Sequence, residues 1–238
     1  MNGTNNISAR ESYRIAREMF YEALRDKFED GPAGDRKCRA WVNSLKLTQG
    51  EIRLEVELNA VNNIFTFGVT PNQNNSNAIT FNTEKRLPLQ DSICATEVQL
   101  WVCKPASRTS TLHLLRTYGN TQDFTAGAAL ALDSTFYSHG NYTLKVNNDV
   151  LVPYRGLANW WYKPQTQQTA ALGAGSPGDQ IRGVEDATCT NEPNTVLIGS
   201  KNSVPQIELP SNLATVDEFT RAVLIYKGPY AQNSTVVN

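Results

Sequence analysis

Residues that build metal sites, disulfide frameworks and nucleic-acid interfaces are scarce in this sequence. It has two histidines and four cysteines, and no two cysteines form a C-x-x-C pair. We therefore expect the thiols to be free and packed in a core, rather than engaged in disulfides or metal binding. Basic and acidic residues number 22 and 23, and no long run of like charge occurs. This balance predicts no sequence-specific nucleic-acid partner.

Signals for export and for membrane insertion are also missing. The first residues, MNGTNNISARES, lack the basic start and the apolar stretch of a secretion signal. No later window approaches the roughly 20 apolar residues that a membrane span requires. We therefore expect a soluble chain that is synthesised in the cytoplasm.

Catalytic motifs are absent too. No G-x-S-x-G occurs, and GAGSPG at 173–178 lacks the G-K-[ST] of a phosphate loop. A carboxylate pair for glycoside cleavage would have to come from Asp91, Glu97, Asp123 and Asp133, but no motif joins any two of them. We predict that the chain is not an enzyme and that it uses no cofactor and no metal.

What the sequence does contain begins with one amphipathic helix, predicted over Ser8–Asp30. Ser8 and Glu11 form a capping box at its start, and Gly31 with Pro32 supplies a stop. Its broad apolar stripe consists of Ile15, Ala16, Met19, Phe20, Ala23, Leu24 and Phe28. The stripe must be buried against its own domain, between subunits or along a membrane surface. Because the polar side of the helix carries acids and bases in similar number, burial of the stripe along a membrane surface is less favoured than the other two alternatives.

After a polar link, DGPAGDRKC, the sequence predicts β structure almost throughout. Glu51–Leu58 alternates without interruption, so its aliphatic residues face a core and its charged residues face water. Ser92–Pro105 reads as a long strand that places Cys94, Thr96, Val98, Leu100 and Val102 on one apolar face. Between these strands lies a polar loop, 70–91, which is tied down by its apolar residues Ile79, Phe81, Leu87 and Leu89.

The remaining strands complete a mainly β architecture. Asn141–Tyr154 is a hairpin, since its turn residues Asn147, Asn148 and Asp149 tolerate positive φ. Other strands are expected at 63–69, 111–118, 128–133, 195–200, 204–210 and 219–227. The pattern predicts a jelly roll or β-sandwich of about eight to ten antiparallel strands behind an N-terminal amphipathic helix. We place the arm and helix at residues 1–34 and a single β (jelly-roll) domain at residues 35–238.

Two groups of residues are candidates for a subunit interface. The first is the helical set Ile15, Met19, Phe20, Leu24 and Phe28. The second is the aromatic cluster Trp160, Trp161 and Tyr162, for which burial in the core and stacking on a sugar are the competing interpretations. In an extended segment Trp160 and Trp161 point to opposite faces, so only one of them can line the core. The following stretch, 165–194, has no period, and a loop of this length is unusual unless it binds something.

The order of segments in the final third resembles a known family. The hairpin YTLKVNNDVLVPY is followed by NWWYKPQTQ, IELPSNLATVD and RAVLIYKGPYAQNST. This layout resembles the C-terminal region of jelly-roll virion shell proteins of tailless bacterial viruses, including those with an internal membrane. The resemblance implies a capsid protein that self-assembles into homo-oligomers and an icosahedral shell. It also implies residence in the virion, contacts with other virion proteins, and a helix that faces a neighbouring subunit or the membrane.

Two further features bear on this interpretation. The chain is short for a double barrel, which favours a single one, and it lacks the arginine-rich arm of coats that condense a naked genome. The alternative is a spike or lectin-like β-sandwich module that recognises a receptor or glycan. Such a module would bind through Trp160, Trp161, Tyr162 and the loop beyond Gln165.

Overall fold

The helices and strands of the protein are defined here on a computed structural model, which describes residues 9–111, 115, 132, 135–147, 149–160 and 188–236. The helical elements are α1 (Ala9–Leu24), the 3₁₀ turn η1 (Arg25–Lys27), α2 (Pro32–Ser44), α3 (Thr135–His139) and the 3₁₀ turn η2 (Leu157–Trp160). The strands are β1 (Leu47–Glu57), β2 (Ile64–Thr66), β3 (Ser92–Cys103), β4 (Asn141–Val146), β5 (Asp149–Gly156), β6 (Thr188–Ile198), β7 (Ser203–Glu208) and β8 (Arg221–Ala231).

The N-terminal region contains two helices where the sequence predicted one. α1 ends at Leu24, and the expected polar link after it is wrong, because α2 begins at Pro32. The cause is local: proline is well suited to the first position of a helix, and Gly31, with φ 94°, reverses the chain just before it. Cys38 and Val42 lie four residues apart on the buried side of α2. The predicted domain boundary at residue 34 therefore falls inside this helix.

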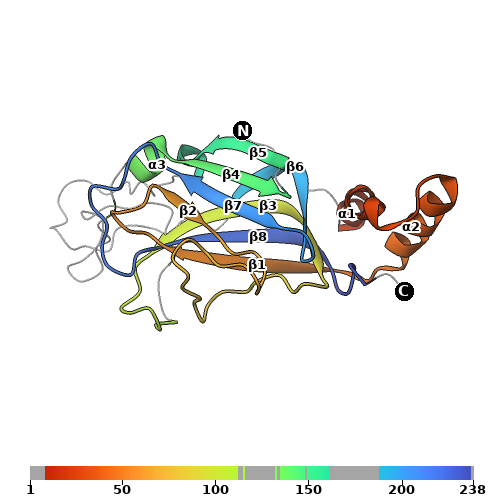
Figure 1. The fold of residues 1–238 in the computed structure, drawn as a ribbon, viewed down its shortest axis with the longest axis horizontal. Helices are drawn as coiled ribbons and strands as arrows, with labels where there is room; N and C mark the ends of the chain where they lie inside the picture. Colours follow the sequence, from red (N-terminus) through yellow and green to blue (C-terminus); the bar gives the residue numbers. More distant parts are fainter. Residues whose placement is uncertain are drawn as a thin grey trace, which may run out of the picture.

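The strands form two antiparallel four-stranded sheets. This confirms the prediction of a mainly β chain that follows an N-terminal helix. The strand orders of the sheets are β1-β8-β3-β6 and β2-β7-β4-β5. Figure 1 shows the sheets as two layers, with α1 and α2 beyond one end of the strands. The predicted hairpin is confirmed as β4 and β5, with Asn147 at φ 49° in the turn. The expected strands at 111–118 and 128–133 lie largely outside the described residues.

The main hydrophobic core takes residues from both sheets. Alternation in β1 is confirmed on its inner side, since Ile52, Leu54 and Val56 are buried in this core. The facing sheet contributes Phe65, Tyr142, Leu144 and Ile207. Side chains on one face of each strand thus meet those of the other layer, which is how two stacked sheets exclude water.

One irregularity in β3 changes which side chains face this core. The pairing of β3 with β8 passes from Ile93↔Tyr230 to Glu97↔Lys227, so β3 carries one extra residue at that point. Before this bulge Ile93 and Ala95 lie in the core between the sheets, and after it Val98, Leu100 and Val102 do. The single apolar face predicted for the whole strand is therefore wrong at Cys94, which points to the other side.

Gly228 permits this bulge. A Cβ atom at position 228 would lie 2.0 Å from the carbonyl oxygen of Cys94, so only glycine fits there.

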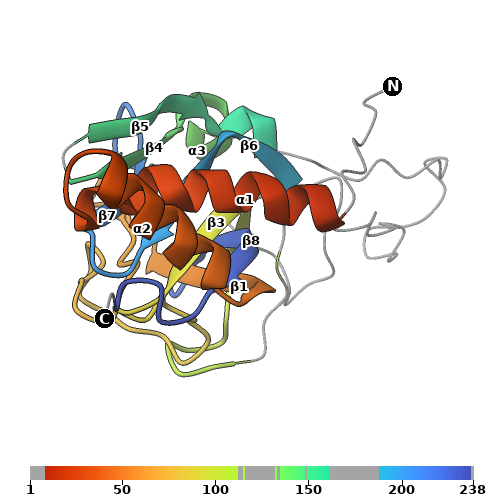
Figure 2. The same cartoon turned by 90° about the vertical axis from the view of Figure 1, so that its right-hand side faces the viewer.

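The two helices cover one end of the β1-β8-β3-β6 sheet, as Figure 2 shows from that side. A second hydrophobic cluster joins Ala16, Phe20 and Leu24 of α1 to the strand ends Cys94, Val196, Ile198 and Ala231, and Cys38, Val42 and Leu45 complete it. The amphipathic stripe of the helix thus finds its cover within the same chain.

Candidate assembly surfaces

The five predicted interface residues of the helical set divide into those inside the fold and those at its surface, and Phe28 among them lies just after α1 and η1. Phe20 and Leu24 have no exposed surface and pack in the cluster beneath the helices. Met19 and Phe28 are half-buried against the same cluster, and Ile15 is also half-buried. Only these last three retain surface that a second molecule could contact.

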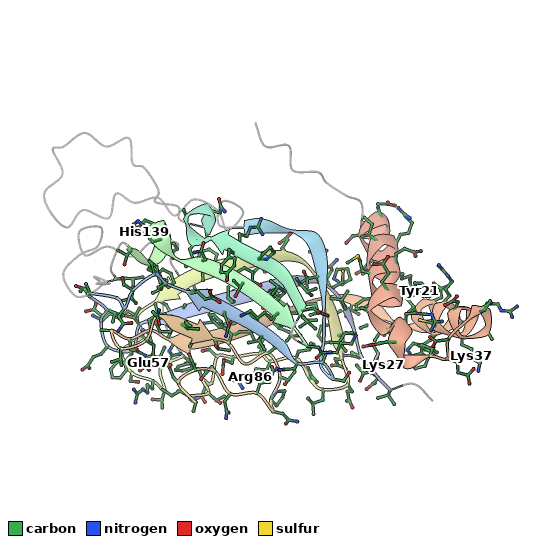
Figure 3. All side chains as sticks on the ribbon, turned by 45° about the horizontal axis from the view of Figure 1, so that its top comes forward. Tyr21, Lys27, Lys37, Glu57, Arg86 and His139 are labelled. Carbon is green, nitrogen blue, oxygen red and sulfur yellow. The ribbon has the colours of Figure 1, made fainter. Side chains whose placement is uncertain are left out.

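Polar contacts also fix the helices to the segments that follow β6 and β8. Lys201 after β6 donates from Nζ to the carbonyl oxygen of Ala23 at 3.0 Å and pairs with Asp26 at the same distance. Lys27 Nζ donates to the carbonyl oxygen of Thr235 at 3.3 Å, and Trp41 Nε1 donates to that of Ser234 at 3.3 Å. Figure 3 shows Tyr21, Lys27 and Lys37 together at the helical end of the molecule, away from His139. The helices are therefore an integral layer of this fold.

Trp160 lies in the core rather than at a surface. Its ring is almost fully buried, meets Tyr142 edge-on at 5.7 Å between centroids, and lies under the guanidinium of Arg155 at 5.3 Å. Its Nε1 donates to the carbonyl oxygen of Val98 at 3.2 Å, which satisfies the one polar atom of the indole. Trp161 and Tyr162 lie outside the described residues, so their assignment stays a prediction.

The carboxylates considered for catalysis do not meet in the described part of the chain. Asp91 is buried and accepts hydrogen bonds from the Tyr230 hydroxyl and, at 2.8 Å, from the backbone N–H of Asn233. Glu97 is exposed at the bulge of β3, whereas Asp123 and Asp133 lie outside the described residues. Asp91 thus anchors the C-terminal segment to the start of β3.

The described residues hold no group of three histidines, cysteines or acids placed to bind a metal ion. Cys38, Cys94 and Cys103 are buried, and Cys38 and Cys94 are free thiols, as predicted, while the side chain of Cys189 lies outside the described part. Burial raises the pKa of the Cys94 thiol to about 11, and it also raises the pKa of Cys38. These thiols are packing groups at neutral pH. Among the described helices, none is long and apolar enough to cross a membrane.

A buried ionic cluster lies where the sequence predicted a solvated face. Glu55 of β1 has no exposed surface and accepts from Arg221 Nη1 at 2.9 Å and from Arg53 Nε at 2.8 Å. The Arg221 guanidinium stacks on the ring of Phe81 at 3.9 Å and donates to the carbonyl oxygen of Arg108 at 2.7 Å. The prediction that Glu55 faces water is wrong, because the 70–91 loop folds over this side of β1.

Glu84 is the second carboxylate of this cluster and fixes the 70–91 loop. It accepts from the backbone N–H of Phe81 at 3.0 Å and of Glu55 at 3.2 Å, and it pairs with Arg86 at 3.1 Å. Burial raises the pKa of Glu84 despite these hydrogen bonds and the charge of Arg86. The predicted anchors Phe81 and Leu87 are indeed buried, but Leu89 is exposed.

Exposed apolar side chains gather at the two edges of the β2-β7-β4-β5 sheet. Val150, Leu151 and Tyr154 of β5 are 51%, 41% and 69% exposed, and Val61 and Ile64 at the β2 edge are 78% and 47% exposed. Sequence reasoning missed the β5 residues because VLVPY reads as an ordinary apolar strand. Pro153 was the available signal, since proline inside a strand marks an edge.

Comparison of the chain with protein-family models, with curated proteins and with solved structures finds no match.

Proposed function

We propose that the β domain is a single jelly roll. The supporting observation is the nesting of its antiparallel pairs: β4 with β5, β3 with β6, β2 with β7 and β1 with β8. Such nesting is what one long antiparallel ribbon has when its two halves lie side by side. The further pairs β3 with β8 and β4 with β7 then arise when this ribbon rolls up into two sheets. Jelly rolls of eight strands occur in viral capsid and lectin domains.

On this basis the chain is a structural protein that self-assembles into the icosahedral shell of a bacterial virus. The nested strand order carries the proposal, and the resemblance of the final third to jelly-roll shell proteins agrees with it. The chain is made in the host cytoplasm and functions in the virion, beside its own copies and other virion proteins. It performs no catalytic step and needs no cofactor.

The helical layer is assigned to the inner side of the shell, toward a neighbouring subunit or an internal membrane. Of the interface residues predicted in this layer, Ile15, Met19 and Phe28 keep exposed surface for this contact. Around them the layer carries ion pairs, such as Arg39 with Glu18 at 3.6 Å and Lys37 with Glu29 at 3.2 Å. Paired charges of both signs suit a protein neighbour better than an anionic lipid surface.

A receptor- or glycan-binding module is the alternative from another functional class. The burial of Trp160 removes this residue from any glycan platform. The alternative then depends on Trp161, Tyr162 and the loop beyond Gln165, all outside the described residues.

Light scattering and negative-stain microscopy of the purified chain across a range of concentrations test the proposal. Trimers, pentamers or closed shells are expected, with subunit contacts above about 1,000 Å² each. A folded chain that stays monomeric at high concentration contradicts the proposal. Specific retention on a glycan array by that monomer would establish the alternative.

A further inference from the structure

At the β5 edge of the β2-β7-β4-β5 sheet, irregularities of the backbone pairing turn apolar side chains outward. Register with β4 passes from Tyr142↔Arg155 to Leu144↔Val152 and then to Lys145↔Val150, so β5 has an extra residue at each of two points. These are two bulges, and bulges re-aim side chains. As a result Val152 alone points inward, while its apolar neighbours Val150, Leu151, Pro153 and Tyr154 are exposed.

This edge is unsuited to accept another strand, although it is apolar. Pro153 has no N–H to donate, and Tyr154 sits at φ 38°, outside the extended region. Bulges and proline are devices that block strand addition at sheet edges. A partner of this edge therefore contacts its side chains rather than its backbone.

The opposite edge of the same sheet has matching properties. Val61 and Ile64 are exposed there, whereas the backbone of β2 is occupied at Thr66. Thr66 accepts from the N–H of Ser76 at 3.0 Å, and its own N–H donates to the Ser76 hydroxyl at 3.2 Å. Strand addition is thus blocked on this side too, and apolar side chains are again what the edge offers.

The outer faces of both sheets offer few exposed apolar side chains for a contact that excludes water. On the β2-β7-β4-β5 sheet, polar side chains bond to one another: Gln206 donates to Thr66 at 3.0 Å, and Lys145 donates to Gln206 at 3.3 Å. On the other sheet, the two helices cover one end of the strands, and the 70–91 loop lies over the outer side of β1 near Glu55. The exposed aliphatic and aromatic side chains are therefore concentrated at lateral edges, which lie on opposite sides of one sheet.

We infer that the β5 edge of one molecule docks on the β2 edge of a second copy of this chain. This inference rests on the proposed function, which requires contacts between copies. Because the two edges differ and point in opposite directions, the contact is head-to-tail and can repeat from copy to copy, as a ring or shell requires. Tyr154, the largest side chain of the set and the most exposed one on the β5 edge, is its central anchor.

The test blocks one edge at a time and then mixes the products. Variant one carries Leu151→Lys with Tyr154→Lys, and variant two carries Val61→Lys with Ile64→Lys. All four positions are exposed, so folding is expected to be unaffected, and unfolding curves check this. Leu89→Lys, at an exposed leucine that belongs to the 70–91 loop and to neither edge strand, is the matched control.

Each blocked variant alone is expected to associate at least about 30-fold more weakly than the parent, the effect of losing one interface anchor. Mixed in equal amounts, the two variants form a 1:1 dimer through their remaining intact edges and grow no further. Light scattering and native mass spectrometry give the sizes.

Three outcomes overturn the inference, and they differ in what they leave standing. If the parent and both variants assemble alike, this contact is wrong and the proposed function survives. If the variants are blocked singly but fail to pair when mixed, the edges do not meet head-to-tail. If the parent itself stays monomeric, the proposed function fails together with the contact.

Discussion

The inner faces of both sheets are apolar and share one core, but the two outer faces differ in what covers them. On β1-β8-β3-β6 the chain covers its own outer face, with helices at one end and the 70–91 loop near the other. On β2-β7-β4-β5 the outer face carries polar residues bonded to each other, such as Lys145 and Gln206. Charged residues occur on both outer faces, yet Glu55 is fully buried and Lys145 is not. In β1, alternation therefore identifies the inner face of the strand, whereas later segments of the chain decide whether its outer face meets water.

Removing the arginine of the buried pair is expected to destabilise the covered face most. Arg221→Ala removes the fully buried partner of Glu55 and leaves Arg53 as its remaining cation. Breaking a buried ion pair in this way typically costs about 3–5 kcal/mol of unfolding free energy. Urea denaturation followed by fluorescence measures the loss. Arg108→Ala is the control, because Arg108 is exposed and solvent screens its ion pair with Glu57, so the loss of stability should be much smaller. Equal losses in the two variants would mean that the cluster contributes no more than a surface pair.

At the helical end of the same sheet, the expected loss of unfolding free energy comes from a cavity rather than from an unpaired buried charge. Leu24→Ala removes a fully buried side chain from the cluster between α1 and the strand ends, at a cost of about 2–5 kcal/mol. Glu22→Ala on the exposed side of α1 should change stability by less than about 0.5 kcal/mol. Thermal melts of both variants measure the difference. A Leu24 variant as stable as the parent would show that the helix is only loosely attached.

Thiol chemistry reports on the same helix without unfolding the protein. Since the raised pKa of about 11 leaves little Cys94 thiolate at pH 8.5, native alkylation should be at least about 100-fold slower than in urea. Peptide mapping after timed iodoacetamide exposure resolves Cys94 from the other cysteines. Leu24→Ala is expected to speed this reaction, whereas Glu22→Ala is not. Rapid labelling of Cys94 in the parent would contradict the tight cover seen here.

The smallest expected effect is the contribution of Glu84 to the pH dependence of the unfolding free energy. The pKa of Glu84 is raised in the fold, so the native state holds a proton more tightly than the unfolded chain does. This group therefore adds stability as pH falls toward its ordinary value near 4.5, and loses that contribution as pH rises through the folded pKa. The slope cannot exceed about 1.4 kcal/mol per pH unit for one proton. Glu84→Gln should flatten the pH profile of urea unfolding in this window, and an unchanged profile would contradict the assignment.

Local sequence signals predicted much of the β domain. The hairpin of β4 and β5 followed from its Asn-rich turn, and the inner side of β1 followed from strict alternation. The helix α2 was missed because Gly31 and Pro32 were interpreted only as a stop, although the same pair suits the start of a second helix. Its few apolar residues gave a weak pattern that the charged residues around them obscured.

The candidate surfaces were harder to predict, because exposure depends on tertiary neighbours. Phe20 and Leu24 were correctly assigned to an apolar stripe, but the sequence left open which partner would cover it. The outward turn of Leu151 and Tyr154 depends on two bulges in the pairing with β4. Such irregular pairings follow no period, so alternation does not detect them, and Pro153 was the one local sign of an edge strand.

The bulge in β3 constrains how this protein can diverge. One added residue reverses the phase of the strand, so Cys94 reaches the helices while Val98 remains in the core. Deleting that residue would exchange inner and outer positions along one half of the strand, and a side chain at position 228 would collide with the bulged backbone. The added residue and Gly228 must therefore be inherited together. Descendants of this chain are expected to retain both, even where the surrounding side chains have been replaced.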